Sequence, residues 1–162
     1  MNTFPTIDMT TMSKVIAIDP GASGGIAWHD GEIAVCSNLP ETIYDFRDMM
    51  IRFKSLDPNW TCFMEDVPSF IGGKNLGNSM TKLHRSAGRI EGVLCAMSFR
   101  VEMVTPQKWQ KYFSLGKRSE CATDSIWKNK LKTKAAQLFP HCDVTLKTAD
   151  ALLILEYGMK QV

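Results

Sequence analysis

The sequence lacks the features of several protein classes. No apolar run approaches the ~20 residues that span a bilayer, and residues 1–12 carry no basic residue ahead of an apolar stretch, as a signal peptide would. The five cysteines are odd in number and form no CxxC pair, which argues against a disulfide framework and against a zinc site. There is no internal repeat. We therefore expect a soluble, cytoplasmic protein with reduced thiols and no membrane partner.

The length limits the number of domains. A chain of 162 residues is one domain long, which is enough to bury a core and too short for a two-lobed enzyme. Residues 1–13 are Thr-rich and are expected to form a disordered tail. Residues 14–162 are expected to form a single domain.

The charge is small overall and unevenly divided. The formal net charge is +2. Residues 1–71 carry ten Asp and Glu against four Lys and Arg, whereas residues 72–162 carry seven against fifteen. A basic second half suits a phosphate backbone, although solvated helix faces are also rich in lysine.

The stretch from Val15 to Trp28 combines a buried strand with an acid. Four apolar residues, VIAI, predict a strand buried on both faces, and the strand ends at Asp19. The small and turn-forming residues of PGASGG (20–25) then reverse the chain into a second strand, and Asp30 with Gly31 predicts a turn into a third. Asp19 is therefore expected near the centre of a sheet, beside an uncrowded turn.

A second strand ends in the same way. The run from Trp60 to Met64 is apolar apart from one threonine, and it ends at Glu65. A helix predicted over 41–56 separates this strand from the first, so the two can lie parallel and adjacent with both acids at one edge.

The same patterns predict, further along, a loop over 68–79, a helix over 80–97, a strand over 99–104 and helices over 105–113, 119–139 and 148–158.

Three acids adjoin apolar segments: Asp19, Glu65 and Asp150, the last in the first turn of the final helix. Each has an ordinary explanation, because Asp150 could favour a helix start and Glu65 could pair with a lysine. Together they suit divalent cations, because Mg²⁺ takes hard oxygen ligands and keeps substrate phosphate oxygens in its remaining positions. Two such ions could activate water for attack on a phosphodiester.

These residues resemble a known family. IDPGASGG (18–25), MEDVP (64–68), VTPQKW (104–109), KAAQLFP (134–140) and TADALLI (148–154) are similar, in this order, to RuvC-type Holliday-junction resolvases, especially their viral and organellar branches. The resemblance implies an α/β, ribonuclease-H-like fold with a mixed five-stranded sheet flanked by helices. It also implies a homodimer that makes paired nicks in four-way DNA junctions with Mg²⁺ or Mn²⁺, two ions per active site. By position, Asp19, Glu65 and Asp150 correspond to the first, second and last catalytic acids of the family.

One position departs from the family. Three residues before its last acid the family usually has another metal-binding side chain, and this sequence has Lys147. Asp143 or Glu156 could supply the missing oxygen, one ion could be held with more water, or Lys147 could act in catalysis by stabilising charge on the phosphate. Glu156 is the poorer substitute, because it lies six residues after Asp150 on the same helix.

Junction recognition requires many phosphate contacts, and the second half supplies the cations. The residues expected to bind DNA are Lys74, Lys82, Arg85, Arg89, Lys108, Lys111, Lys130 and Lys134, from a pool that also holds Lys117, Arg118, Lys128 and Lys132. In the family, the region after the second acid inserts near the crossover, so Phe70 or Leu76 could act as a wedge; core packing is the alternative. The apolar stripe Met80, Leu83, Ala87 and Ile90 is either plain core or, as the family implies, the dimer contact.

Three other functions compete with this interpretation. The actin and sugar-kinase ATPase fold also begins with a strand, an acid and glycines, but it needs two lobes. A ribonuclease-H-type enzyme that cuts RNA-DNA hybrids would use the same acids. A junction-binding protein without catalysis is compatible with a lysine at position 147.

Overall fold

A computed structural model describes residues 13–67 and 77–162. Within that part of the chain, five strands form one sheet in the order β3-β2-β1-β4-β5. The strands are β1 (Val15–Ile18), β2 (Gly25–His29), β3 (Ala34–Asn38), β4 (Thr61–Glu65) and β5 (Arg100–Val104). β1 pairs antiparallel with β2 and parallel with β4, and β4 pairs parallel with β5. The expected mixed five-stranded sheet is therefore confirmed.

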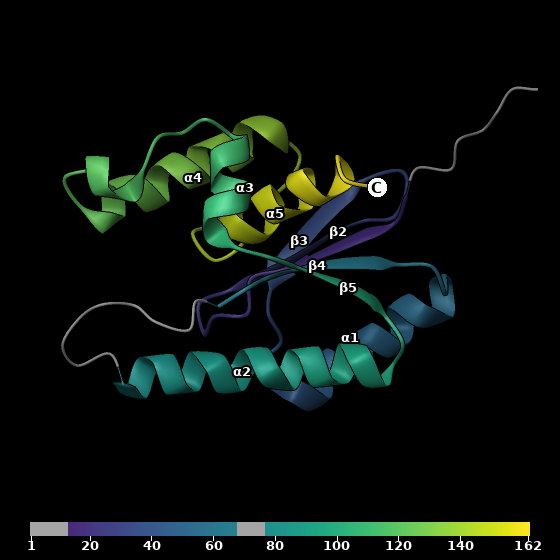
Figure 1. Cartoon of the computed structure of the whole chain (residues 1–162). Helices are drawn as coiled ribbons and strands as arrows, with labels where there is room; N and C mark the ends of the chain where they lie inside the picture. Colours follow the sequence, from purple (N-terminus) through teal and green to yellow (C-terminus); the bar gives the residue numbers. More distant parts are fainter. Residues whose placement is uncertain (1–12, 68–76) are drawn as a thin grey trace, which may run out of the picture.

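Helices cover both faces of the sheet (Figure 1). One face is covered by α1 (Ile43–Leu56) and α2 (Gly77–Ala96), and the other by α3 (Pro106–Tyr112), α4 (Asp124–Leu138) and α5 (Ala149–Met159). A 3-10 helix (Arg118–Glu120) precedes α4. None of these described helices is long and apolar enough to cross a membrane.

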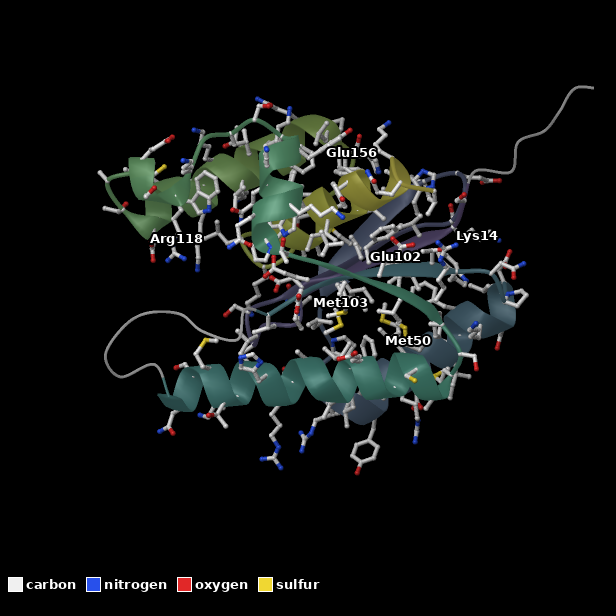
Figure 2. All side chains as sticks on the ribbon, in the orientation of Figure 1. Lys14, Met50, Glu102, Met103, Arg118 and Glu156 are labelled. Carbon is white, nitrogen blue, oxygen red and sulfur yellow. The ribbon has the colours of Figure 1, made fainter. Side chains whose placement is uncertain are left out.

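Alternate side chains of the two central strands enter two different cores. Val15 and Ala17 of β1 join Phe63 of β4 in the core under α5. Ile16 points the other way, into the core under α1 and α2, to which Met50 also belongs (Figure 2). Successive side chains of a strand point to opposite faces of the sheet. The same alternation therefore sets the face toward which the residue after each strand points.

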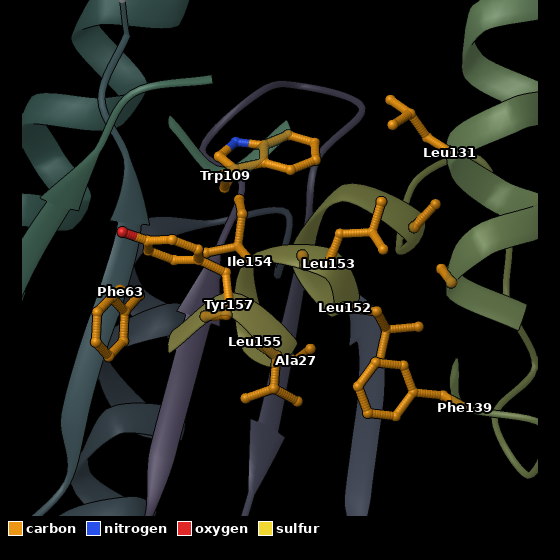
Figure 3. Close-up of a cluster of buried hydrophobic side chains, with 14 of the residues drawn as sticks. Ala27, Phe63, Trp109, Leu131, Phe139, Leu152, Leu153, Ile154, Leu155 and Tyr157 are labelled. Atoms are coloured by element: carbon orange, nitrogen blue, oxygen red, sulfur yellow. The ribbon is translucent and has the colours of Figure 1, made fainter. Parts of the chain in front are cut away.

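Helix α5 lies at the centre of the first core. Figure 3 shows it surrounded by Phe63, Trp109 and Phe139. A Cβ added at Gly158 would lie 2.5 Å from a ring carbon of Phe63, so α5 lies directly on the sheet at this point. The close contact holds α5, and with it the first turn of that helix, in a fixed position over β1 and β4.

Two element boundaries differ from those expected by more than two residues. Residues 77–79, assigned to a loop, form the first turn of α2, since small polar residues are common at helix starts; residues 68–76 lie outside the described part, as do residues 1–12 of the expected tail. The helix expected over 119–139 begins at Asp124, because the side chain of Thr123 accepts a hydrogen bond from the amide of Ile126 (3.3 Å) and caps a new helix there.

The apolar stripe of α2 packs within its own chain. Ala87 and Ile90 are buried in the core under α1 and α2, and Met80 and Leu83 pack against that core. Core packing, one of the two expected roles of this stripe, is therefore confirmed, and the dimer contact stays a prediction.

Candidate active site

The sheet register places two of the three acids side by side. Ile18 of β1 is paired with Met64 of β4 in parallel register, and Asp19 and Glu65 are the next residues of the two strands. Parity directs both side chains toward the face covered by α5, because they follow Ala17 and Phe63 on that face. The first turn of α5 carries Asp150.

The chain needs a glycine to bring the start of α5 to the sheet. A Cβ at Gly25, the first residue of β2, would lie 2.5 Å from the carbonyl oxygen of Lys147 and 3.0 Å from Cα of Thr148. A side chain there would push the start of α5 away from β2. Three acids that are distant in the sequence are thus brought together by register, parity and one close backbone contact.

Electrostatic coupling indicates that the three carboxyl groups are neighbours. Burial raises the pKa of Asp19 above its ordinary value. Burial, then the charge of Asp19 and that of Asp150, raise the pKa of Glu65 to about 8. Burial and the charge of Asp19 raise the pKa of Asp150 to about 7. Glu65 and Asp150 therefore both lie within electrostatic reach of Asp19.

Two hydrogen bonds orient the acids. The indole Nε1 of Trp109 on α3 donates to Oε2 of Glu65 at 2.8 Å, and Trp109 itself is completely buried. The amide of Gly21, in the glycine turn, donates to Oδ1 of Asp19 at 3.3 Å. Both bonds favour the charged carboxylate and oppose the effect of burial. Nothing in the sequence identified Trp109 as a partner of an acid.

Replacing Trp109 with Phe should raise the pKa of Glu65 further, because it removes a donor that stabilises the carboxylate. Above pH 8 the variant should also lose about 1–3 kcal/mol of stability, as expected when a hydrogen bond to a charged group is removed. The pKa can be followed by carbon NMR of the carboxyl groups. Trp127→Phe is the control, since Trp127 lies in the same buried cluster on α4. Equal titration of Glu65 in both variants would contradict the assignment.

The cation that acts on this site is Lys128 of α4. Its charge lowers the pKa of Asp19 and of Asp150. The sequence analysis included Lys128 only among the basic residues that could bind DNA. It assigned the stabilisation of charge on the phosphate to Lys147. The structure instead places Lys147 in the lining of a groove beside the glycine turn. A catalytic role for Lys147 stays a prediction.

Neither proposed substitute for the fourth ligand joins the acids closely. Glu156 lies toward the far end of α5, where its Oε1 is 3.6 Å from Nζ of Lys160 (Figure 2). Asp143 is exposed, and so is Asp66, which follows Glu65 on the opposite face of the strand. The charges that shift the pKa values of Glu65 and Asp150 come from the three acids themselves and from Lys128.

The donor set suits a divalent cation by its chemistry. Three carboxylates with raised pKa values are hard oxygen ligands whose repulsion a cation would relieve. Over residues 13–67 and 77–162, no three His, Cys, Asp or Glu side chains gather closely enough to hold one ion between them. Mg²⁺ does not require such a trio, because proteins usually bind it through one or two carboxylates, waters and substrate phosphates. The acids therefore fit ions that are each held by few protein ligands.

Without metal, the stability of the fold should fall as the pH rises. The pKa of Glu65 rises from 4.5 to about 8, so between these values the folded chain keeps a proton that the unfolded chain releases. Stability from this group is therefore complete below about pH 4.5 and is lost toward pH 8, at a rate on the order of 1.4 kcal/mol per pH unit. Urea unfolding in EDTA from pH 5 to pH 8 measures it. The wild type should lose stability relative to Glu65→Gln, and parallel curves would contradict the prediction.

Comparisons with known proteins identify the fold. No protein-family model matches the sequence, and neither does any curated protein. Among solved structures, "T. thermophilus RuvC in complex with Holliday junction substrate" is 13% identical with a TM-score of 0.59, over 92% of this chain and 94% of that chain. A second, "Thermus thermophilus RuvC structure", is 15% identical with a TM-score of 0.56, over 91% and 95%. The chain has the ribonuclease-H-like fold of RuvC.

On this RuvC-like fold the predicted DNA-binding residues fall into three groups. Lys74 and Phe70 lie outside the described residues. Lys108 and Lys111 lie exposed on α3, and α4 carries Lys130, which is exposed, and Lys134, which is partly buried. The third group lines the groove beside the glycine turn and consists of Lys82, Arg85 and Arg89 of α2. Their contacts with DNA stay predictions.

Proposed function

We propose that this protein is a metal-dependent endonuclease that resolves four-way (Holliday) DNA junctions by paired nicking of phosphodiesters. The observation that carries the proposal is the coupling of Asp19, Glu65 and Asp150 at one edge of the sheet. The fold adds support, since one of the similar solved structures is a RuvC bound to a Holliday junction substrate. A cluster of carboxylates with raised pKa values in a partly exposed site is typical of catalytic centres.

Asp19, Glu65 and Asp150 would hold Mg²⁺ or Mn²⁺, two ions per active site. When bound, these ions would activate the attacking water and stabilise the leaving oxygen. Asp19 raises the pKa of both other acids, so it is the ligand best placed to act with each of them. The sequence motifs further suggest the viral or organellar branch of the resolvases. We also propose an intracellular site of action, since that is where junction DNA lies.

The surrounding residues position these acids and balance their charge. Trp109 holds one oxygen of Glu65 and leaves the other free for a ligand. The amide of Gly21 holds Asp19 in the same way. Lys128 supplies positive charge beside Asp19 and Asp150, where it would favour a bound phosphate. The indole of Trp109 and the amide of Gly21 are held in place by the fold before any substrate binds.

We propose that the active form is a homodimer, because paired nicking of a junction requires two active sites. Sedimentation of the wild type with and without junction DNA measures this. A species of two chains per junction supports the proposal. A single chain per junction, with one nick, would contradict it.

The test of function compares three substrates: a mobile four-way junction, a linear duplex and an RNA-DNA hybrid, each with Mg²⁺, Mn²⁺ or EDTA. Symmetric nicks in the junction alone, lost in EDTA, would support the proposal. Cleavage of the hybrid would favour the ribonuclease-H-type activity instead. Binding of the junction with no nicks under any condition would favour a binding protein.

A further inference from the structure

A groove of about 540 Å³ lies beside the glycine turn, on the side of the sheet covered by α1 and α2. Its lining includes Gly21 and Gly24 of the turn, residues 38–43 and 46, and one side of α2. Phe46 and Ile90 form its apolar part and belong to the core beneath it. This volume is within the range of sites that hold small ligands, so the groove has room for more than a single ion.

Positive charge dominates the lining. Lys82, Arg85 and Arg89 follow one another at intervals of three and four along α2, so they lie on one side of that helix, and Lys147 approaches from the segment before α5. Glu41 is the acid in the lining. The ion pairs found within residues 13–67 and 77–162 involve none of the four cations. Four like charges around one groove repel one another, and an anion would relieve this repulsion.

The groove and the acidic site share the glycine turn. Gly21 lines the groove and also donates its amide to Asp19. Ser86 of α2 donates its hydroxyl to the carbonyl oxygen of Pro20 at 3.1 Å, which fixes the basic side of α2 to the same turn. The cations therefore stand at a defined position next to the acids, on the other side of the turn.

We infer that this groove binds the phosphodiester backbone of the DNA strand next to the phosphate that the three acids receive. The inference rests on the proposed function and extends it to a second phosphate site. It also gives a role in the groove to the lysine at position 147. Arg85 and Arg89 suit this role, because a guanidinium can bind two phosphate oxygens at once.

The test measures binding of a fluorescent four-way junction by anisotropy, in EDTA so that no cleavage occurs, over a range of salt concentrations. Arg85→Gln and Lys147→Gln should each weaken binding and reduce the slope of log K against log salt by about 0.9 for each phosphate that the variant no longer neutralises. The weakening should be similar for junctions of different sequence. Arg52→Gln is the matched control, because Arg52 is exposed on α1 and does not line the groove.

Each result of this test decides the inference. The inference would be overturned if Arg85→Gln and Lys147→Gln gave the same slope of log K against log salt as Arg52→Gln. Competition by ATP at matched ionic strength, lost in Arg85→Gln, would assign the groove to a free nucleotide and would also overturn it. A wild type that binds with the expected slope changes but never nicks the junction would support the groove while the proposed function fails. If the wild type nicks the junction and the groove variants bind it as the control does, the proposed function is supported and the role of the groove in DNA binding is contradicted.

Discussion

Asp19→Asn should bind four-way junctions as well as the wild type and cleave them at least about a thousand-fold more slowly. The substitution removes one metal ligand, and a lost metal contribution of several kcal/mol to the transition state corresponds to this factor. Binding should persist, because the variant removes a negative charge from a site that receives phosphate. Cleavage is measured in single-turnover reactions with Mg²⁺, and binding in EDTA.

The same variant should be more stable than the wild type at pH 8 in EDTA. The charge of Asp19 raises the pKa of Glu65 and of Asp150, so removing it lowers both values and relieves the repulsion. The fall of stability between pH 5 and pH 8 should become shallower. A site that needs clustered negative charge is expected to lower the stability of its own fold in this way, because the carboxylates repel one another.

Asp66→Asn is the control for both measurements. Asp66 adjoins Glu65 in sequence but is exposed on the other face of the strand, so its removal should change neither cleavage nor the pH dependence of stability. If Asp19→Asn lost binding and cleavage to the same degree, or if the Asp66 variant lost cleavage equally, the assignment of Asp19 as a metal ligand would be wrong.

Gly24→Ala should destabilise the fold by about 3 kcal/mol or more, because the new methyl group has no space. A Cβ at Gly24 would lie 2.1 Å from the carbonyl oxygen of Asp19 and 2.8 Å from the backbone of Gly21. Both neighbours are backbone atoms, so the turn itself must move and Asp19 must move with it. Molecules that still fold should therefore cleave more slowly than the wild type. Urea unfolding and single-turnover cleavage measure the two effects.

Gly88→Ala provides the matched comparison. Gly88 lies inside α2, and a Cβ there would meet no atom within 4 Å. Alanine should therefore stabilise the helix by up to about 1 kcal/mol, as it does at exposed helix positions. If the Gly24 variant were as stable as the Gly88 variant, the tight turn would not be what positions Asp19.

The sequence was sufficient to predict how the acids meet. Two apolar runs that each end in a carboxylate, separated by a helix, favour parallel neighbours, and the observed pairing of Ile18 with Met64 brings Asp19 next to Glu65. Strand parity then distinguishes Glu65 from Asp66. These inferences succeed because they depend on local geometry, which a sequence pattern records directly.

The contacts made across the fold could not be predicted in the same way. Trp109 and Lys128 act on the acids from two other helices, and no spacing in the sequence relates either residue to Asp19. The stripe of α2 shows the same limit, since Ala87 and Ile90 would have the same periodicity whether they covered the sheet or another chain. Periodicity identifies an apolar side of a helix and does not identify what it covers.

The burial of α5 has a consequence for the motions open to the site. Nearly every residue of this helix is buried, and β1 beneath it is completely buried as well. Their amide hydrogens should exchange with solvent only when the whole domain opens. Any adjustment that draws the carboxylate of Asp150 toward an ion must then come from rotation of its side chain, on a helix whose backbone stays still.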